Sequence, residues 1–307
     1  MKNVLFTGIR SAIFTPLNPD NTVKLDAVKP LVDFTLDRGV KGFYVAGSTG
    51  EGPALNAAER MKIAEAVIDA CKSRKTIYGT TPDVIVHVAA PDVFDAFKLA
   101  KHAKECGADA ISSLAPNFYA SHGPEEMLEY YKRLADCTDL PILIYATGLL
   151  MRTAGSIQNF MEKALEIDHI IGLKYTDPNY HPLNRIKKVN GGDINVINGP
   201  DETLLAGLAM GADGGIGSTY NLVPEKFVKI YDLYNEGKME EARRVQTEVN
   251  DIIDALAGFK GGYGNAAKNT MRFFGIDLGN RAYPAMQYTA DELAELKRVM
   301  RDAGLDI

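Results

Sequence analysis

The chain of 307 residues contains few cysteines, and this scarcity limits the classes of protein to which it can belong. Cys71, Cys106 and Cys137 are odd in number and lack the spacing of a metal site. We therefore expect free thiols in a reducing cytoplasm, without a disulfide framework. The histidines are scattered, and only His87 falls at the end of an expected strand, so no metal site is expected either.

Long apolar runs and dense clusters of basic residues are also missing. No uninterrupted apolar segment approaches the roughly 20 residues that cross a bilayer, and residues 1–15 lack the apolar core of a signal peptide. The net charge is −6, and the chain has no Lys/Arg run that would favour nucleic acid. We therefore expect a cytoplasmic protein without a membrane or nucleic-acid partner.

Short β-rich runs alternate with longer amphipathic stretches through most of the chain. This alternation is typical of βαβ units, and eight such units fit the α/β class as a (β/α)8 TIM barrel. A doubly wound sheet is the alternative, but the glycine-rich turn of a dinucleotide site is absent after the first strand. The expected strands are residues 8–15, 42–46, 84–88, 110–113, 142–145, 170–174, 194–198 and 214–217.

The pattern changes after residue 217, where helical stretches follow one another with no strand between them. These stretches are residues 224–236, 239–259, 265–274 and 290–302. We therefore predict that residues 1–230 form a catalytic barrel. Residues 231–307 would form a C-terminal helical region packed on it.

Lys174 ends the apolar run of the sixth expected strand, at the barrel face where reactive groups gather. Apolar surroundings lower the pKa of an ammonium, and the neutral amine can form a Schiff base with a carbonyl. The alternative is a lysine whose stem lies along the barrel while its ammonium reaches solvent or a carboxylate.

Other strand ends bring further polar groups to the same face. Tyr145 ends the preceding strand, and its hydroxyl could shuttle a proton near Lys174 or could simply reach water. In the loop "AGSTGEG", Ser48 and Thr49 could form a small anion site suited to a carboxylate, or could cap the next helix.

Two segments near the last strands carry the remaining candidates. Asp201 and Glu202 open a helix, where acids favour the helix dipole, but they could also bind a polyhydroxylated substrate. The segment "GGIGSTYN" could cradle a phosphate, although no second basic residue stands beside it.

Together these segments resemble the N-acetylneuraminate lyase subgroup of the dihydrodipicolinate synthase superfamily. The resemblance is carried by "YVAGSTGEG", the tyrosine of "LPILIY", the lysine of "GLKYT", and "NGPDE" followed by "GADGGIGSTYN". It runs in order over nearly the whole chain and implies a (β/α)8 barrel, usually in a homotetramer. It further implies a class I aldolase that needs no metal or cofactor and cleaves a sialic acid reversibly to pyruvate and N-acetylmannosamine.

The resemblance also implies roles for individual residues. Lys174 would be the Schiff-base lysine and Tyr145 the proton shuttle, while Ser48 and Thr49 would hold the pyruvate carboxylate. The residues implied to contact the sugar-derived chain are Thr176, Gly199, Asp201, Glu202 and Ser218.

Several positions separate the subgroups or depart from the family pattern. The synthases typically have "GTTGE" and an arginine five residues after the tyrosine, whereas this chain has "GSTGE" and Leu150, which favours a lyase. Residues 146–152 lack the usual Asn or His followed by Pro, so Arg152 could turn toward a ligand. Phe118 stands where the family often has a tyrosine that reaches across a subunit interface, and Tyr119 follows it.

Three alternatives to a sialic acid lyase stay open at this point. One is an aldolase for another 2-keto-3-deoxy sugar acid, and another is dihydrodipicolinate synthase. The third belongs to a different class, a non-catalytic sensor that binds a keto acid.

Overall fold

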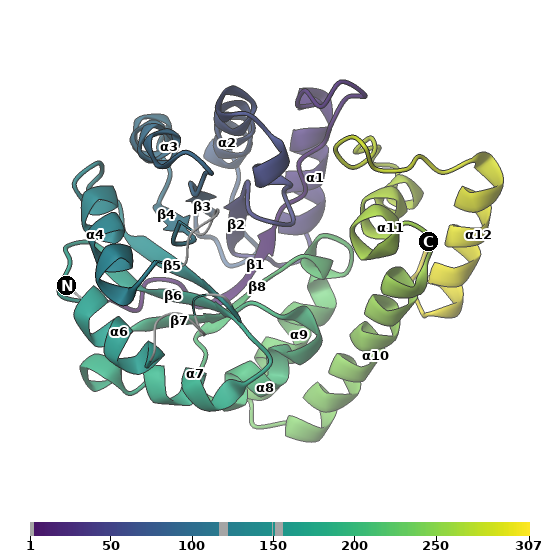
Figure 1. The fold of residues 1–307 in the computed structure, drawn as a ribbon. Coiled ribbons are helices and arrows are strands. Elements are labelled where there is room, and N and C mark those ends of the chain that lie inside the picture. Colours follow the sequence, from purple (N-terminus) through teal and green to yellow (C-terminus); the bar gives the residue numbers. More distant parts are fainter. Residues whose placement is uncertain (1–2, 117–121, 149, 151–155) are drawn as a thin grey trace.

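The computed structural model describes residues 3–116, 122–148, 150 and 156–307, and its eight parallel strands close into a barrel (Figure 1). Each strand pairs with the next along the chain, and the last pairs with the first. The predicted TIM barrel is confirmed, and the doubly wound alternative is wrong. The strands are β1 (Gly8–Ala12), β2 (Gly42–Val45), β3 (Asp83–His87), β4 (Ala110–Ser113), β5 (Ile142–Thr147), β6 (Ile170–Thr176), β7 (Asn195–Asn198) and β8 (Gly214–Gly217).

Helices surround the barrel and cover the outer faces of its strands (Figure 1). Polar side chains begin several of them: Asn56, Asp92 and Ser156 each accept a hydrogen bond from a backbone N–H in the first turn of α2, α3 or α6. These barrel helices are α1 (Val28–Leu36), α2 (Ala57–Lys72), α3 (Val93–Cys106), α4 (Pro124–Ala135), α6 (Ile157–Ala164), α7 (Tyr180–Ile186), α8 (Leu204–Ala209) and α9 (Pro224–Asn235).

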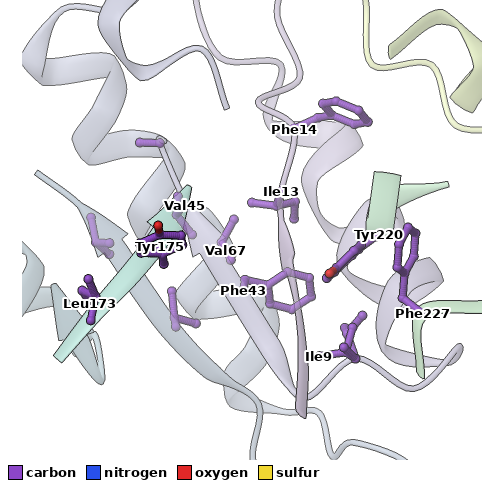
Figure 2. Packing of buried hydrophobic residues seen from close by; sticks show 14 of the residues in the cluster. Ile9, Ile13, Phe14, Phe43, Val45, Val67, Leu173, Tyr175, Tyr220 and Phe227 are labelled. Carbon is purple, nitrogen blue, oxygen red and sulfur yellow. The ribbon is translucent and has the colours of Figure 1, made fainter. Parts of the chain in front are cut away.

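The apolar core has two layers, one between strands and helices and one inside the barrel. Figure 2 shows the first layer, in which Phe43 and Val45 of β2 share a cluster with Val67 of α2 and Phe227 of α9. The interior layer is smaller and includes Ile85, Leu143, Ile171, Ile197 and Ile216. Because it contains apolar side chains from most of the strands, the barrel has a packed floor beneath the polar groups at its carboxyl end.

The strand ends differ from the sequence prediction by one residue at β2 and β3, by two at β5 and β6, and by three at β1. β1 ends at Ala12 and not at residue 15, because the Phe14 N–H turns to the Asn221 side chain and the Thr15 hydroxyl turns to the Gly50 carbonyl. β6 continues to Thr176, two residues beyond the predicted end at Lys174, because it stays paired with the end of β5. Lys174 therefore lies within the strand.

The C-terminal helices α10 (Met239–Gly258), α11 (Gly262–Thr270) and α12 (Ala290–Asp302) gather on one side of the barrel (Figure 1). α10 packs against α8 and α9, and α11 packs against both α10 and α12. The predicted division between residues 230 and 231 falls inside α9, and it stays a prediction. Within the described ranges, no helix is long and apolar enough to cross a membrane.

Candidate active site

A cavity of about 560 Å³ opens at the carboxyl ends of the strands, and it brings together every site residue predicted from the sequence. Its walls come from the strand ends, from the loops that follow them, and from the C-terminal helices α10 and α11. The roles of the predicted residues remain predictions, but their common location is a property of the fold. They are Ser48, Thr49, Tyr145, Lys174, Thr176, Gly199, Asp201, Glu202 and Ser218.

Lys174 is directed into this cavity by the alternation of β6. Leu173 and Tyr175 belong to the layer between strands and helices, so Lys174 and Thr176 face the barrel interior. Lys174 is 6% exposed, and its Nζ lies 4.6 Å from the centroid of the Tyr145 ring and 4.8 Å from that of Tyr44. Such positions over aromatic rings attract a cation.

The alternative role for Lys174, a stem along the barrel with an ammonium in solvent or on a carboxylate, does not fit this geometry. Its side chain is buried, and none of the carboxylates in the described ranges lies within ion-pair distance of its Nζ. The ammonium therefore remains available to a ligand in the cavity.

Tyr145 lies opposite Lys174 in the pairing of β5 with β6. The positive charge of Lys174 lowers the pKa of the Tyr145 phenol below its usual value, and the Ser48 side chain acts in the same direction, while burial opposes both. A lowered pKa makes the phenol easier to deprotonate near neutral pH, as a proton shuttle requires.

The loop after β2 carries Ser48 and Thr49 in a constrained backbone. Ala46 and Glu51 on either side have φ values of 56° and 55°, a left-handed conformation that few non-glycine residues adopt. Gly52 closes the loop against Ala46, where a Cβ would lie 1.9 Å from the carbonyl oxygen. Asn56 caps α2, so capping does not account for Ser48 and Thr49.

Asp201 is buried, and its carboxylate holds the loop that follows β8. Oδ1 accepts a hydrogen bond from the Ser218 N–H at 3.1 Å, and Oδ2 accepts from the Thr219 N–H at 2.6 Å and the Thr219 hydroxyl at 2.7 Å. Burial raises the pKa of the Asp201 carboxyl, although the hydrogen bonds from Thr219 act in the opposite direction. Gly217 makes room for this carboxylate, because a Cβ there would lie 2.0 Å from Oδ1.

Comparison with known proteins gives the family of the chain. The model of the dihydrodipicolinate synthetase family matches residues 5–303. The chain belongs to this family.

The relatives and solved structures agree with that assignment and with the resemblance seen in the motifs. An N-acetylneuraminate lyase of Rhizobium meliloti is 35% identical over 293 residues, which are 95% of this chain and 94% of the relative. The solved sialic acid aldolase of Aliivibrio salmonicida is 28% identical, with a TM-score of 0.89 and 98% of each chain covered. A solved Clostridium difficile protein, CdNal in complex with mannosamine, is 27% identical, with a TM-score of 0.89 over 97% of this chain and 99% of that one.

In this dihydrodipicolinate synthetase family member, sequence reasoning missed two tyrosines, one beside Lys174 and one in the cavity wall. Tyr44 flanks Lys174 from β2, and the period of two along that strand could have placed it inside the barrel. Tyr263 of α11 lines the cavity, and its hydroxyl lies 2.7 Å from that of Thr219. Because the Thr219 hydroxyl donates to Asp201, the Tyr263 hydroxyl is the donor to Thr219.

Below Lys174 the barrel holds a buried polar network around His87. The Tyr44 hydroxyl lies 3.1 Å from His87 Nδ1 and donates to Ser112 Oγ at 3.0 Å. Burial, with the positive charges of Arg60 and Lys174, lowers the pKa of His87 well below its usual value, so the ring is neutral. His87 is therefore a buried core histidine with a hydrogen-bond partner.

The remaining predictions concern metals, thiols and the altered loops. Among the described residues, no group of three or more His, Cys, Asp or Glu side chains is placed to hold a metal ion. The three cysteines are free thiols, as expected. The predictions about Phe118, Tyr119 and Arg152 lie outside the described residues.

Proposed function

We propose that this chain is a class I aldolase that cleaves N-acetylneuraminate reversibly to pyruvate and N-acetylmannosamine. The observation that carries the proposal is Lys174, buried between two tyrosine rings at a cavity of about 560 Å³. The family assignment and the lyase relatives support a pyruvate-dependent carbon–carbon lyase. They also make N-acetylneuraminate the substrate to test first.

The first chemical step forms the Schiff base. The neutral amine of Lys174 adds to the C2 carbonyl of the open-chain sugar acid, and loss of water leaves an iminium ion. Tyr145 lies next to the amine and, with its lowered pKa, transfers the protons that this addition and dehydration require.

Carbon–carbon bond cleavage follows, because the iminium ion can accept the electron pair of the bond that breaks. The C3–C4 bond breaks, its electron pair forms the enamine of pyruvate, and the proton of the C4 hydroxyl passes to Tyr145. The aldehyde of N-acetylmannosamine leaves. The enamine is protonated at C3, and water hydrolyses the resulting iminium to release pyruvate and restore Lys174.

The two ends of the cavity would hold the two ends of the substrate. Ser48 and Thr49 bind the carboxylate through their hydroxyls and the surrounding backbone N–H groups. At the other end, Thr176 lines the cavity beside Gly199, where a Cβ would lie 1.9 Å from Thr176 Oγ1, and its side chain also helps to lower the pKa of Tyr145. Gly199, Asp201, Glu202 and Ser218 complete this sugar end.

Asp201 acts in this scheme mainly through the loop that it holds. Its carboxylate already accepts hydrogen bonds from Ser218 and Thr219, so it orients the Ser218 hydroxyl at the cavity. Glu202 beside it offers the freer carboxylate for sugar hydroxyls.

Leu150 weighs against dihydrodipicolinate synthase as the activity. It is 3% exposed and apolar at the position where synthases typically have an arginine for a second substrate carboxylate. An apolar side chain cannot make that contact. A substrate with a single carboxylate at the Ser48–Thr49 end therefore fits better.

Two broader features belong to the same proposal. Like the subgroup that it resembles, the protein works as a homotetramer in the cytoplasm. Its reaction needs no metal or cofactor, because the iminium of Lys174 serves as the electron sink.

Pyruvate release from N-acetylneuraminate tests this function. The purified protein should release pyruvate steadily, and Lys174→Ala should reduce the rate to background while the circular dichroism of the fold is retained. Another 2-keto-3-deoxy sugar acid should be cleaved more slowly. Absence of release by the wild-type protein, or a Lys174→Ala variant that retains near-normal rate, would contradict the proposal.

A further inference from the structure

A buried ion pair joins the candidate site to the C-terminal helices. Lys268 of α11 is fully buried, and its Nζ donates to Glu51 Oε1 at 2.9 Å. The other oxygen of Glu51 accepts a hydrogen bond from the Ala282 N–H at 2.7 Å and lies 3.4 Å from Arg281 Nε. Both partners of the pair have side chains that are at most 5% exposed.

Stability alone is a weak explanation for such a pair. Taking two charges out of water costs free energy that their attraction only partly returns, and apolar pairs of similar volume often replace them without loss. The ion pair is therefore better explained by the part of the structure that it holds in place.

Glu51 lies in the loop that carries Ser48 and Thr49, two residues after Thr49. Its N–H donates to the Ser48 carbonyl, its backbone is left-handed, and the next residue closes the loop through the Gly52 N–H to Gly47 carbonyl bond. A shift of the Glu51 side chain would be transmitted directly to this turn, because hydrogen bonds fix the backbone on both sides of it.

The same helix also reaches the opposite end of the cavity. Tyr263 precedes Lys268 by five residues on α11, and its hydroxyl donates to Thr219, which in turn donates to Asp201. α11 thus contacts the loop after β2 through Lys268 and the loop after β8 through Tyr263. These two loops carry the carboxylate end and the sugar end of the proposed site.

We propose that α11 is a brace for the active site, and that Lys268, acting through Glu51, is a positioning residue for the substrate carboxylate. Lys268 holds the loop in the geometry that lets Ser48 and Thr49 bind pyruvate. Because this role presupposes the proposed function, its test uses pyruvate alone and does not depend on which sugar acid is the substrate.

The test measures the pyruvate concentration that half-saturates imine formation, trapped with borohydride and followed by mass spectrometry. In Lys268→Met, the half-saturating concentration should rise about tenfold, which corresponds to about 1.4 kcal/mol of pyruvate affinity. The fraction trapped at saturating pyruvate should stay near that of wild type, because Lys174 itself is unchanged.

A second variant tests whether lost stability, and not lost positioning, explains the effect of Lys268→Met. Lys268→Met leaves the Glu51 charge buried without its main partner, whereas Glu51→Gln with Lys268→Met removes both charges. The double variant should regain thermal stability, because the amide oxygen introduced by Glu51→Gln can still accept from the Ala282 N–H. It should nevertheless keep the raised half-saturation, because the bond that ties the loop to α11 is gone.

Lys187→Met is the matched control. Lys187 also donates to a carboxylate, that of Asp213 at 2.7 Å, but Asp213 precedes β8 and so lies at the opposite end of the barrel from the cavity. This variant should lose stability while its half-saturating pyruvate concentration stays at the wild-type value. A purely structural role for Lys268 would make the two lysine variants behave alike.

The outcomes separate the two proposals. Failure to trap any imine in wild-type protein would contradict the proposed function before a variant is compared. Normal trapping in wild type, with unchanged half-saturation in folded Lys268→Met or in the double variant, would overturn the positioning role and leave the function intact.

Discussion

At the residue scale, the chemistry depends on a lysine and a tyrosine that face each other across two paired strands. Lys174 and Tyr145 are register partners of β6 and β5, and the ring of Tyr44 completes the surroundings of the ammonium. Replacing Tyr145 tests the proton transfers while Lys174, the Schiff-base residue, stays in place.

Tyr145→Phe should lower kcat by a factor on the order of 10²–10⁴, the range expected for loss of a general acid–base group. Steady-state pyruvate release measures this effect, and borohydride trapping should show that the imine still forms on Lys174, but more slowly than in the wild-type protein. Tyr131→Phe is the control, because the Tyr131 hydroxyl is buried on α4 and donates to the Ser113 carbonyl outside the cavity. Equal rates in the two variants would remove Tyr145 from the mechanism.

The pKa of Tyr145 gives a test that is independent of turnover. Its ordinary value is near 10, the positive charge of Lys174 lowers it, and burial raises it. Lys174→Met removes the charge and leaves the burial, so the phenol should then titrate at higher pH. Ultraviolet titration measures the midpoint of the Tyr145 phenol. The signal of the other tyrosines is removed by subtracting the titration of the same protein with Tyr145→Phe added. A midpoint that stays constant or falls in Lys174→Met would contradict the electrostatic coupling.

Most of the candidate site could be predicted at this scale from residue types at strand ends. Lys174 and Tyr145 lie near the ends of apolar strands, the Ser48–Thr49 loop follows another, and parallel strands bring their ends together. Tyr263 could not be found in this way, because its contact with Thr219 joins a helix to a loop and no local pattern reports it.

At the scale of elements, the extra length of β6 places a second side chain in the cavity. Pairing with β5 continues to Thr176, which therefore faces inward two residues beyond Lys174. The sequence predicted a strand end at Lys174, because the polar residues that follow resemble the start of a loop. Alternation places Tyr175 outside and its polar neighbours inside only if the strand continues past Lys174, and the polar sequence there does not show that it does.

Thr176→Val should separate binding from stability. The Thr176 hydroxyl is buried and makes no hydrogen bond of regular geometry among the described residues, although it lies close enough to the Tyr145 phenol to help lower the pKa of that group. Replacing the hydroxyl with a methyl group should therefore raise the free energy of unfolding by about 1 kcal/mol. KM for the sugar acid should rise about fivefold, with the pyruvate half-saturation unchanged, because the lost contact would be worth about 1 kcal/mol. Denaturant unfolding and steady-state kinetics measure the two effects.

Thr35→Val is the control for that stability change. The buried Thr35 hydroxyl donates to the Leu31 and Val32 carbonyls, so this variant should lose stability. If Thr176→Val were destabilised to the same extent, the Thr176 hydroxyl would have a partner in the free protein, and its assignment to the substrate would be wrong.

At the scale of the whole molecule, the barrel and the C-terminal helices form one site together. The sequence predicts both parts well, since the periods of two and 3.6 residues report strands and helices locally. It does not report which helix face meets which loop. Lys268 and Glu51 are 217 positions apart in the chain, so their contact became visible only in the folded structure.

The most direct measurement for the whole account is the mass of the intact chain after borohydride treatment with pyruvate, followed by peptide mapping. The account predicts a single pyruvate-derived adduct per chain, on the peptide that contains Lys174. It predicts no adduct in Lys174→Ala under the same conditions. Absence of an adduct in wild-type protein, or an adduct on any other lysine, would contradict the assignment of Lys174 as the Schiff-base residue.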